Sequence, residues 1–248
     1  YKRCGKKLKF GCQNAFAVSR RAWYHEEKRV RELMVLSEAS IACGSAGDLA
    51  AVLPQYERDF PEEERKSSRR LAALLERGDY SLLLLRDASE LLGYAFVCQC
   101  HRALWLDYIA ISPHFRGLGF GSFFFQELLQ LREDLDGVFL EVEPATGKET
   151  ALKRQRQKRI AFYERLGAVR LGFPYFFPTP TGGFPLHLYF KPQERLTALS
   201  KHCLKRTVES VFNLAHRDLA CCGEVLARNL AAIEEQFGGT GKGKEFCQ

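Results

Sequence analysis

Seven residues near the middle of the chain read Arg116-Gly117-Leu118-Gly119-Phe120-Gly121-Ser122. They follow an apolar run at 104–111 and precede an amphipathic stretch at 123–132, which predicts a strand, a glycine turn and the start of a helix. Glycines let the backbone approach a ligand without Cβ atoms in the way, so that several N–H groups can point at one anion. Because the positive end of the helix dipole also favours negative charge, the segment predicts a pyrophosphate site.

Two other glycine-rich phosphate motifs do not fit the chain. The dinucleotide fingerprint Gly-x-Gly-x-x-Gly needs its third glycine one residue later than Gly121. The tail at 238–244 has P-loop spacing, but Glu245 stands where that motif needs Ser or Thr, and no helical pattern follows. We interpret this segment as a flexible tail.

Together with Ser112-Pro113, the order Arg-x-x-Gly-x-Gly resembles the acetyl-CoA-binding motif of the GNAT superfamily of N-acetyltransferases. A second segment is similar to the same family: a strand-like run at 138–143, then a helix that ends Phe162-Tyr163-Glu164-Arg165-Leu166-Gly167. The resemblance covers about 37–192 and implies an α/β (α+β) GNAT fold, with a mixed central sheet flanked by helices.

The periodicity of apolar residues predicts the order of the elements. Before the glycine turn we expect a strand at 37–43, a helix that starts at Gly47-Asp48, a second helix from Pro61 to about Gly78, and strands at 80–85, 91–100 and 104–111. After it we expect a strand at 137–143, a helix at about 150–166, and strands at about 168–174 and 184–191.

Residues 193–237 carry a helical apolar stripe that a GNAT core does not need. The stripe fits either a helix or helical pair packed on the domain, or a homodimer through these helices. We therefore divide the chain into a basic N-terminal extension at 1–36, an acetyltransferase domain at 37–192, and a C-terminal helical extension with its tail at 193–248.

The net charge of +7 lies in the N-terminal segment, because residues 1–33 hold ten lysines and arginines against three glutamates. The only methionine is Met34, so we expect either a natural start there or a segment outside the fold. A basic arm can bind nucleic acid, but no recognisable nucleic-acid-binding module accompanies it, and we expect no nucleic-acid partner. No apolar run is long enough for a membrane span, so we expect no membrane partner.

The nine cysteines show no paired Cys-x-x-Cys spacing and no secretion signal. Reduced thiols in a cytoplasmic protein are the expected state. Cys98-x-Cys100-His101 would put two thiols on one face of a strand without a second ligand pair, so we expect no metal site.

The resemblance implies the residues that bind the co-substrate acetyl-CoA. Backbone N–H groups of Ile109, Ala110 and Ile111 would bind the pantetheine arm and polarise the thioester carbonyl. The phosphates would lie on the loop of Arg116, Gly117, Leu118, Gly119, Phe120, Gly121 and Ser122, where Arg116 either pairs with a phosphate or orients the loop. The family often carries an asparagine near the start of the following Phe-Tyr helix, and Gln155 or Gln157 is the nearest substitute here.

Amide formation from a thioester needs a neutral amine and a way to protonate the leaving thiolate. By the resemblance, Tyr163 is the candidate general acid. Asp107, in the strand that borders the thioester, is the first candidate for the general base. Glu143 and Glu141 compete with it from the neighbouring strand and share one face of that strand. A water relay can also replace a direct base in this family.

The sequence thus predicts an enzyme that transfers an acetyl group from acetyl-CoA to a primary amine by direct attack. The acceptor is a small-molecule or peptide amine, and the aromatic run at 173–178 with Phe184 predicts an aromatic acceptor edge. Two alternatives come from other classes: a catalytically silent acyl-CoA-binding module that interacts with other proteins, and a nucleic-acid binder that uses the basic arm.

Overall fold

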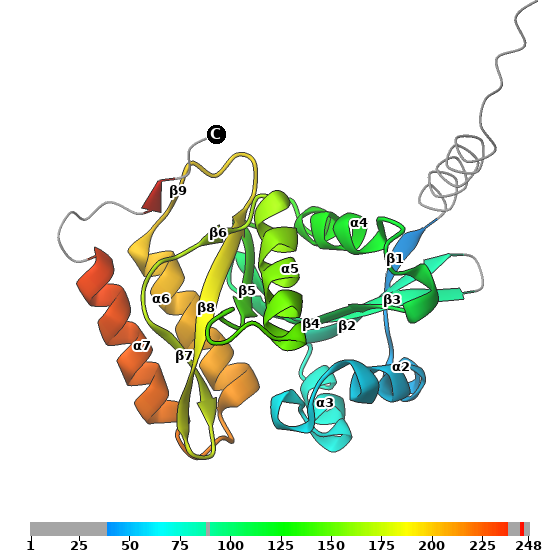
Figure 1. Cartoon of the computed structure of the whole chain (residues 1–248), viewed down its shortest axis with the longest axis horizontal. Coiled ribbons are helices and arrows are strands. Elements are labelled where there is room, and N and C mark those ends of the chain that lie inside the picture. Colours follow the sequence, from blue (N-terminus) through cyan, green and yellow to red (C-terminus); the bar gives the residue numbers. More distant parts are fainter. Residues whose placement is uncertain (1–38, 88–89, 238–243, 246–248) are drawn as a thin grey trace, which may run out of the picture.

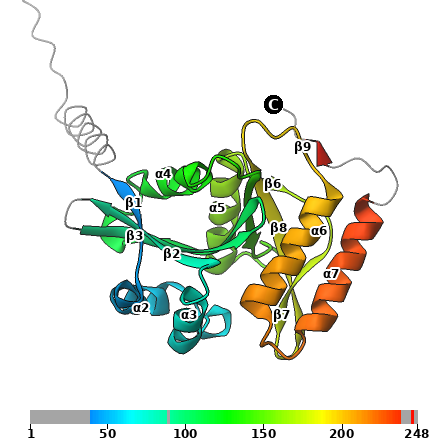
Figure 2. The ribbon, with the colours of Figure 1, turned by 180° about the vertical axis from the view of Figure 1, so that it is seen from behind.

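The computed structural model describes residues 39–87, 90–237 and 244–245, and Figure 1 shows their arrangement. The predictions for the segment at 1–36 and for most of the glycine-rich tail lie outside the described residues. The remaining chain forms a mixed sheet covered by helices on both faces, as the sequence predicts (Figures 1 and 2).

The main sheet has eight strands in the order β1-β2-β3-β4-β5-β8-β6, and β7 pairs with β8 off this path. Neighbouring strands are antiparallel except for the pair β4 and β5, which is parallel. The strands are β1 (Ser40–Cys43), β2 (Tyr80–Asp87), β3 (Glu90–Cys100), β4 (Ala103–Ile111), β5 (Gly137–Val142), β6 (Val169–Arg170), β7 (Tyr175–Thr179) and β8 (Gly182–Pro192).

Two hydrophobic cores lie on opposite faces of the sheet. One core joins the sheet to α2 (Ala46–Asp59), α3 (Ser68–Leu75), α6 (Lys201–Val211) and α7 (Cys222–Phe237). The other joins it to α4 (Phe120–Glu127) and α5 (Ala151–Arg165). Figure 1 views the molecule from the side of α5, and Figure 2 views it from the side of α6 and α7.

The first helix begins where the sequence predicts it. Ser45 and Asp48 form a capping box, in which the Ser45 hydroxyl accepts from the Asp48 N–H and the Asp48 carboxylate accepts from the Ser45 N–H. The second predicted helix, from Pro61 to Gly78, is wrong as a continuous element. A short 3₁₀ turn η1 (Glu62–Glu64) is followed by an extended break, and α3 starts only after its N-cap Ser67.

This break is stabilised by a buried tyrosine. The Lys66 N–H donates to the Tyr56 hydroxyl over 2.8 Å, so the backbone donor at position 66 is satisfied outside any helix. The Ser67 hydroxyl then accepts from the Arg70 N–H and starts the new helix. As a result, the side chain of Lys66 turns toward the sheet and is buried.

Strands β4 and β5 pair along only part of their length. The parallel register runs from Ala103 opposite Gly137 to Leu106 opposite Leu140, and the residues of β4 beyond Leu106 form no pair with β5. At the same point, the register of β3 with β4 shifts, because Phe96 lies opposite Tyr108 whereas Val97 lies opposite Leu106. Asp107 is therefore the extra residue of a β-bulge, placed where the two parallel strands separate.

The strand predicted at 168–174 is also wrong in its extent. Only Val169–Arg170 joins the sheet there, as β6, and residues Tyr175–Thr179 form the separate strand β7. The turn between β7 and β8 uses Gly182, which has a φ of +123°, so the segment of prolines and glycines closes a hairpin.

The residues after β8 form a helical pair rather than one helix. A short strand β9 (Ala198–Leu199) pairs with β10 (Lys244–Glu245), and α6 is followed by the π-helical turn η4 (Phe212–His216) and by α7. Of the stripe residues, Leu199, Val208, Val211 and Ile233 are buried within the chain, and Leu204 and Val225 beside them are buried as well. The homodimer stays a prediction.

Candidate active site

A cavity of about 440 Å³ lies between the separated ends of β4 and β5. Helices α4 and α5 border it on one side and the end of α2 on the other. The residues that line it are Asp59, Phe60, Leu106, Asp107, Tyr108, Ile109, Ala110, Ile111, Arg116, Gly121, Leu140, Glu141, Gln155, Arg159, Phe162 and Tyr163. The predicted backbone positions Ile109, Ala110 and Ile111 are thus at the cavity, on an edge of β4 that no described strand covers.

The glycine loop connects this edge to the N-terminus of α4. Gly117 has a φ of +80° and Gly119 a φ of +90°, which are left-handed conformations that favour glycine. Gly119 is the N-cap of α4, so Phe120, Gly121 and Ser122 form the first helical turn, whose N–H groups have no partner within the helix. A Cβ at Gly121 would lie 3.6 Å from the Phe162 ring, which is an ordinary contact. The left-handed turn therefore depends on Gly117 and Gly119.

Arg116 holds the loop in place. Its Nε donates to the Ile111 carbonyl over 2.8 Å, and its guanidinium lies 2.7 Å from the Asp59 carboxylate at the end of α2. The Arg116 side chain is still 51% exposed and lines the cavity. Of the two predicted roles, these contacts support the orientation of the loop, and the exposed part of the guanidinium is open to an anion.

Tyr163 lies on the last turns of α5 and faces the cavity. Its ring packs against Phe125 and Phe162, and burial raises the pKa of Tyr163 to about 12. The phenol is therefore protonated at neutral pH and able to donate a proton. The structure thus places the predicted acid on the same cavity as the glycine loop.

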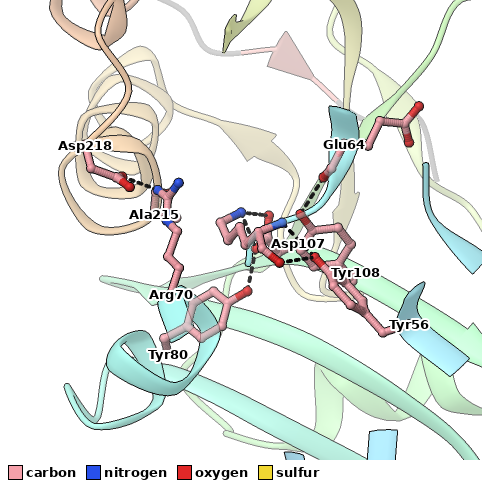
Figure 3. A network of polar contacts seen from close by, with 9 residues as sticks. Tyr56, Glu64, Arg70, Tyr80, Asp107, Tyr108, Ala215 and Asp218 are labelled. Carbon is pink, nitrogen blue, oxygen red and sulfur yellow. Dashed lines mark hydrogen bonds and ion pairs between the residues drawn. The ribbon is translucent and has the colours of Figure 1, made fainter. Parts of the chain in front are cut away.

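Asp107 also lines the cavity, but its carboxylate is already engaged (Figure 3). The Lys66 ammonium donates to both carboxylate oxygens, over 2.9 and 2.6 Å, and the Tyr80 hydroxyl donates to Oδ2. The Lys66 and Asp107 side chains are only 5% and 4% exposed, so this ion pair is buried. The Asp107 carboxylate therefore accepts three hydrogen bonds within the fold, two from Lys66 and one from Tyr80.

The two glutamates of the neighbouring strand have different surroundings. Glu141 lines the cavity and accepts a 2.7 Å hydrogen bond from the Tyr175 hydroxyl. Burial raises the pKa of Glu141 to about 7, although the hydrogen bond from Tyr175 acts in the opposite direction. Glu143 follows the end of β5 and binds Arg159, with Arg156 3.9 Å away, so it points to α5 and does not line the cavity. The predicted shared orientation of the two side chains is therefore not observed.

Helix α5 contributes Gln155 and Arg159 to the cavity wall. Gln157, the other predicted substitute for the family asparagine, is exposed and does not line the cavity. Of the two glutamines, Gln155 is the one that borders the cavity.

The aromatic run at 173–178 does not line the cavity. Phe173 and Tyr175 are buried in the core, Phe176 lies under the Arg228 guanidinium, and Phe177 contacts His216. The aromatic wall at the cavity is made instead by Phe60 and Tyr108, whose rings meet edge to face with centroids 4.9 Å apart.

Within the described part of the chain, no group of three or more His, Cys, Asp and Glu side chains could hold a metal ion. The six cysteines that the structure describes are all free thiols. No described helix is long and apolar enough to cross a membrane.

Sequence reasoning missed the residues that hold the two cavity carboxylates. Lys66 and Tyr80 come to Asp107 from positions 41 and 27 residues away in sequence. Tyr175 reaches Glu141 across 34 residues. None of the three belongs to a motif, and the only signal was the position of Tyr175 in an aromatic run.

Comparisons with known proteins agree with this architecture. Residues 49–168 match the family model of the acetyltransferase (GNAT) family. A Bacteroides thetaiotaomicron protein assigned to the GNAT family of acetyltransferases superposes with a TM-score of 0.54 at 19% identity, over 62% of this chain and 87% of that one. A dodecameric spermidine N-acetyltransferase from Vibrio cholerae gives a TM-score of 0.47 at 17% identity, over 64% of this chain and 96% of that one.

An uncharacterized protein of Dictyostelium discoideum is 33% identical over 79 residues, which are 31% of this chain. The match spans only 18% of the length of that relative. The family match covers the glycine loop, both separated strands and the helix of Tyr163. Residues 49–168 therefore form an acetyltransferase domain of the GNAT family.

Proposed function

We propose that the protein is an N-acyltransferase that transfers an acetyl group from acetyl-CoA to a primary amine. One observation carries the proposal: a left-handed glycine loop, an unpaired strand edge, a protonated tyrosine and a carboxyl group with a pKa of about 7 all border one cavity. These are the groups that amide formation from a thioester requires.

The cavity residues fit acetyl-CoA in their chemistry. The pyrophosphate would contact the loop at 117–122, because the free N–H groups at the start of α4 and the exposed part of Arg116 favour an anion. The backbone of β4 at 109–111 would bind the amide groups of the pantetheine arm as a neighbouring strand does. Gln155 on α5 would supply a further polar contact.

Glu141 is the proton acceptor of this proposal, in place of Asp107 and Glu143. Its pKa of about 7 lets it take up a proton near neutral pH, whereas Asp107 is already hydrogen-bonded to Lys66 and Tyr80. Glu143 is bound to the arginines of α5, outside the cavity lining.

The chemistry balances with these two residues. The positively charged amine first releases one proton to water, and the neutral nitrogen then loses a second proton to Glu141 as it forms the bond to the carbonyl carbon. The carbon–sulfur bond then breaks. Tyr163 supplies a proton to the leaving sulfur, and backbone N–H groups of β4 stabilise the charge that develops on the carbonyl oxygen. Among the described residues that line the cavity there is no cysteine or serine, which supports direct attack by the amine over an acyl-enzyme route.

The acceptor of the proposal is a small-molecule or peptide amine that carries a positive charge before reaction. The aromatic rings of Phe60 and Tyr108 and the carboxyl group of Glu141 border the cavity together. Aromatic faces and carboxylates both attract an ammonium group, which gives the acceptor its orientation toward Glu141.

The test is a calorimetric titration of the protein with acetyl-CoA and with CoA, followed on the same sample by thiol release across a panel of primary amines. Binding with thiol release on at least one amine is the expected result. Tight binding without release on any amine supports the silent acyl-CoA-binding module, and the absence of binding contradicts both.

A further inference from the structure

The helices that follow the family domain are linked to the cavity residues by two separate series of contacts, which we call routes. Helices α6 and α7 and the turn η4 lie after residue 168, where the family match ends. They pack on the same face of the sheet as α2 and α3. Each route begins at a polar contact of this extension and ends at a carboxylate of the cavity.

The first route begins at Asn229 on α7. This side chain is fully buried, its Oδ1 accepts from the Phe176 N–H over 2.9 Å, and its Nδ2 donates to the Phe176 carbonyl over 2.9 Å. One edge of β7 pairs with β8, and no described strand pairs with the other edge. At that second edge the Asn229 amide binds both backbone groups of Phe176, as a partner strand would. The neighbouring Arg228 adds a cation–π contact, with its guanidinium carbon 3.5 Å from the Phe176 ring centroid.

Residue 175 is the next link of this route. The Tyr175 hydroxyl donates the 2.7 Å hydrogen bond to Glu141, and Tyr175 shares a peptide unit with the residue that Asn229 holds. Because a peptide unit is planar and rigid, a shift of the Phe176 backbone also shifts Tyr175. The hydroxyl of Tyr175 lies at hydrogen-bond distance only while β7 keeps its place.

The second route begins at the turn η4 and at the segment that follows it (Figure 3). The Arg70 guanidinium on α3 donates to the Ala215 carbonyl and forms an ion pair with Asp218. Lys66, one turn before Arg70 in sequence, donates to both oxygens of Asp107. Contacts of the extension with Arg70 therefore fix the start of α3, and with it the lysine that neutralises Asp107.

We propose that the C-terminal helices position the carboxylates of the active site, with Asn229 holding Tyr175 on Glu141 and Arg70 holding Lys66 on Asp107. The inference rests on the proposed function, because it takes Glu141 as the proton acceptor. Asn229 and Arg70 are positioning residues, since neither lines the cavity. The extension is on this view an integral part of the enzyme, and its loss disables the site even where the family domain folds.

The groups that face Glu141 decide in which direction its pKa shifts when either route is lost. Burial raises the pKa of Glu141 most strongly, and the hydrogen bond from Tyr175 on β7 lowers it. Asp107 from β4 raises this pKa, whereas Lys66 from the segment before α3 and Trp105 from β4 lower it. A loosened Tyr175 or a withdrawn Lys66 therefore raises the pKa of Glu141. Loss of either route moves the acidic limb of the pH–rate profile upward.

The experiment is a set of pH profiles of kcat/KM for the wild-type protein, Asn229→Ala, Tyr175→Phe and the double variant. Each single substitution is expected to move the acidic limb upward by about one pH unit, because a hydrogen bond to the charged carboxylate is lost. The double variant is expected to show no further shift, since Asn229 acts through Tyr175.

Two matched controls lie in the same extension. Asn213→Ala removes an exposed asparagine of η4 and is expected to leave the limb in place. Val208→Ala truncates a buried side chain of α6 and is expected to lower the melting temperature without moving the limb.

Arg70→Met tests the second route independently and is also expected to shift the limb upward.

A limb that stays at its wild-type position in Asn229→Ala and Arg70→Met overturns the inference, as do shifts that add in the double variant. If Asn229→Ala does not fold, the position of the limb in Arg70→Met decides. The variant Glu141→Gln distinguishes an error in the assignment of Glu141 as the proton acceptor from an error in the inference about the C-terminal helices. If it keeps the wild-type limb, the assignment of Glu141 itself is wrong; if it loses the limb while the positioning variants behave as wild type, only the inference is wrong.

Discussion

The Lys66 ammonium lies 2.6 Å from the Asp107 carboxylate, and both side chains are almost fully buried. The Lys66 Nζ also lies 5.1 Å from the centroid of the Tyr108 ring. Around this pair, the Tyr108 hydroxyl donates to the Glu64 carbonyl over 2.7 Å, so the bulge of β4 is tied to the segment before α3 (Figure 3). Asp107 is the residue that the sequence favoured as the general base. In the structure its negative charge is paired with the Lys66 ammonium.

Lys66→Met is expected to destabilise the protein by about 3–5 kcal/mol, because removal of one partner leaves a buried charge without its counter-ion. The measurement is urea unfolding at neutral pH. The double variant Lys66→Met/Asp107→Asn is expected to recover most of the loss, since no charge is then left buried. Arg132→Met serves as control because its pair with Asp134 is at the surface, and it is expected to have little effect. A loss in the double variant as large as in the single one would contradict a charge-based explanation.

Glu141→Gln is expected to change how stability depends on pH. Burial raises the pKa of Glu141 from its ordinary 4.5 to about 7, so the folded protein binds this proton more tightly than the unfolded chain does. This contribution to stability is full below pH 4.5 and is lost as the pH rises to about 7. Relative to wild type, the variant should therefore gain roughly 3 kcal/mol in the free energy of unfolding between pH 4.5 and pH 8. Denaturant unfolding at both pH values measures it, and a constant difference between the two proteins would show that Glu141 titrates normally.

Tyr163→Phe is expected to lower kcat by about 10- to 1,000-fold with little change in affinity for acetyl-CoA, because only proton donation to the leaving sulfur is lost. The ring still fills its place against Phe125 and Phe162. Steady-state kinetics and a calorimetric titration of the same preparation separate the two effects. Unchanged turnover would remove Tyr163 from the mechanism.

Gly119→Val is expected to abolish binding of acetyl-CoA. A φ of +90° strains any β-branched residue, and the side chain would also occupy the approach of a phosphate to the loop. Gly223→Ala is the matched control, since a Cβ at that position in α7 meets no atom within 4 Å and binding should stay normal. Normal affinity in Gly119→Val would contradict the assignment of the loop.

The sequence predicted those parts of the molecule that follow from local pattern. The glycine run, the helix start near Gly47-Asp48 and the Tyr163 helix are local signals, and the structure has the expected element at each of these places. The break at Lys66 was missed because it depends on Tyr56, ten residues earlier, whose hydroxyl satisfies the backbone there.

The proton acceptor could not be chosen from sequence for the same reason. Asp107, Glu141 and Glu143 are all carboxylates on neighbouring strands, and only their partners distinguish them. Two of those partners, Lys66 and Tyr175, reach the site through long-range packing, and Tyr175 lies on a strand that the periodicity did not predict. The burial that raises the pKa of Glu141 is likewise a property of the assembled fold.

The most direct test of the account is the pH profile of kcat/KM for wild type and Glu141→Gln with one accepted amine. We predict an acidic limb near pH 7 in the wild-type protein, well below the pKa of about 10 of the amine itself. In Glu141→Gln that limb should be absent and activity should fall by about 10²- to 10⁴-fold. A variant that keeps both the wild-type limb and the wild-type rate would contradict the role of Glu141 as the proton acceptor.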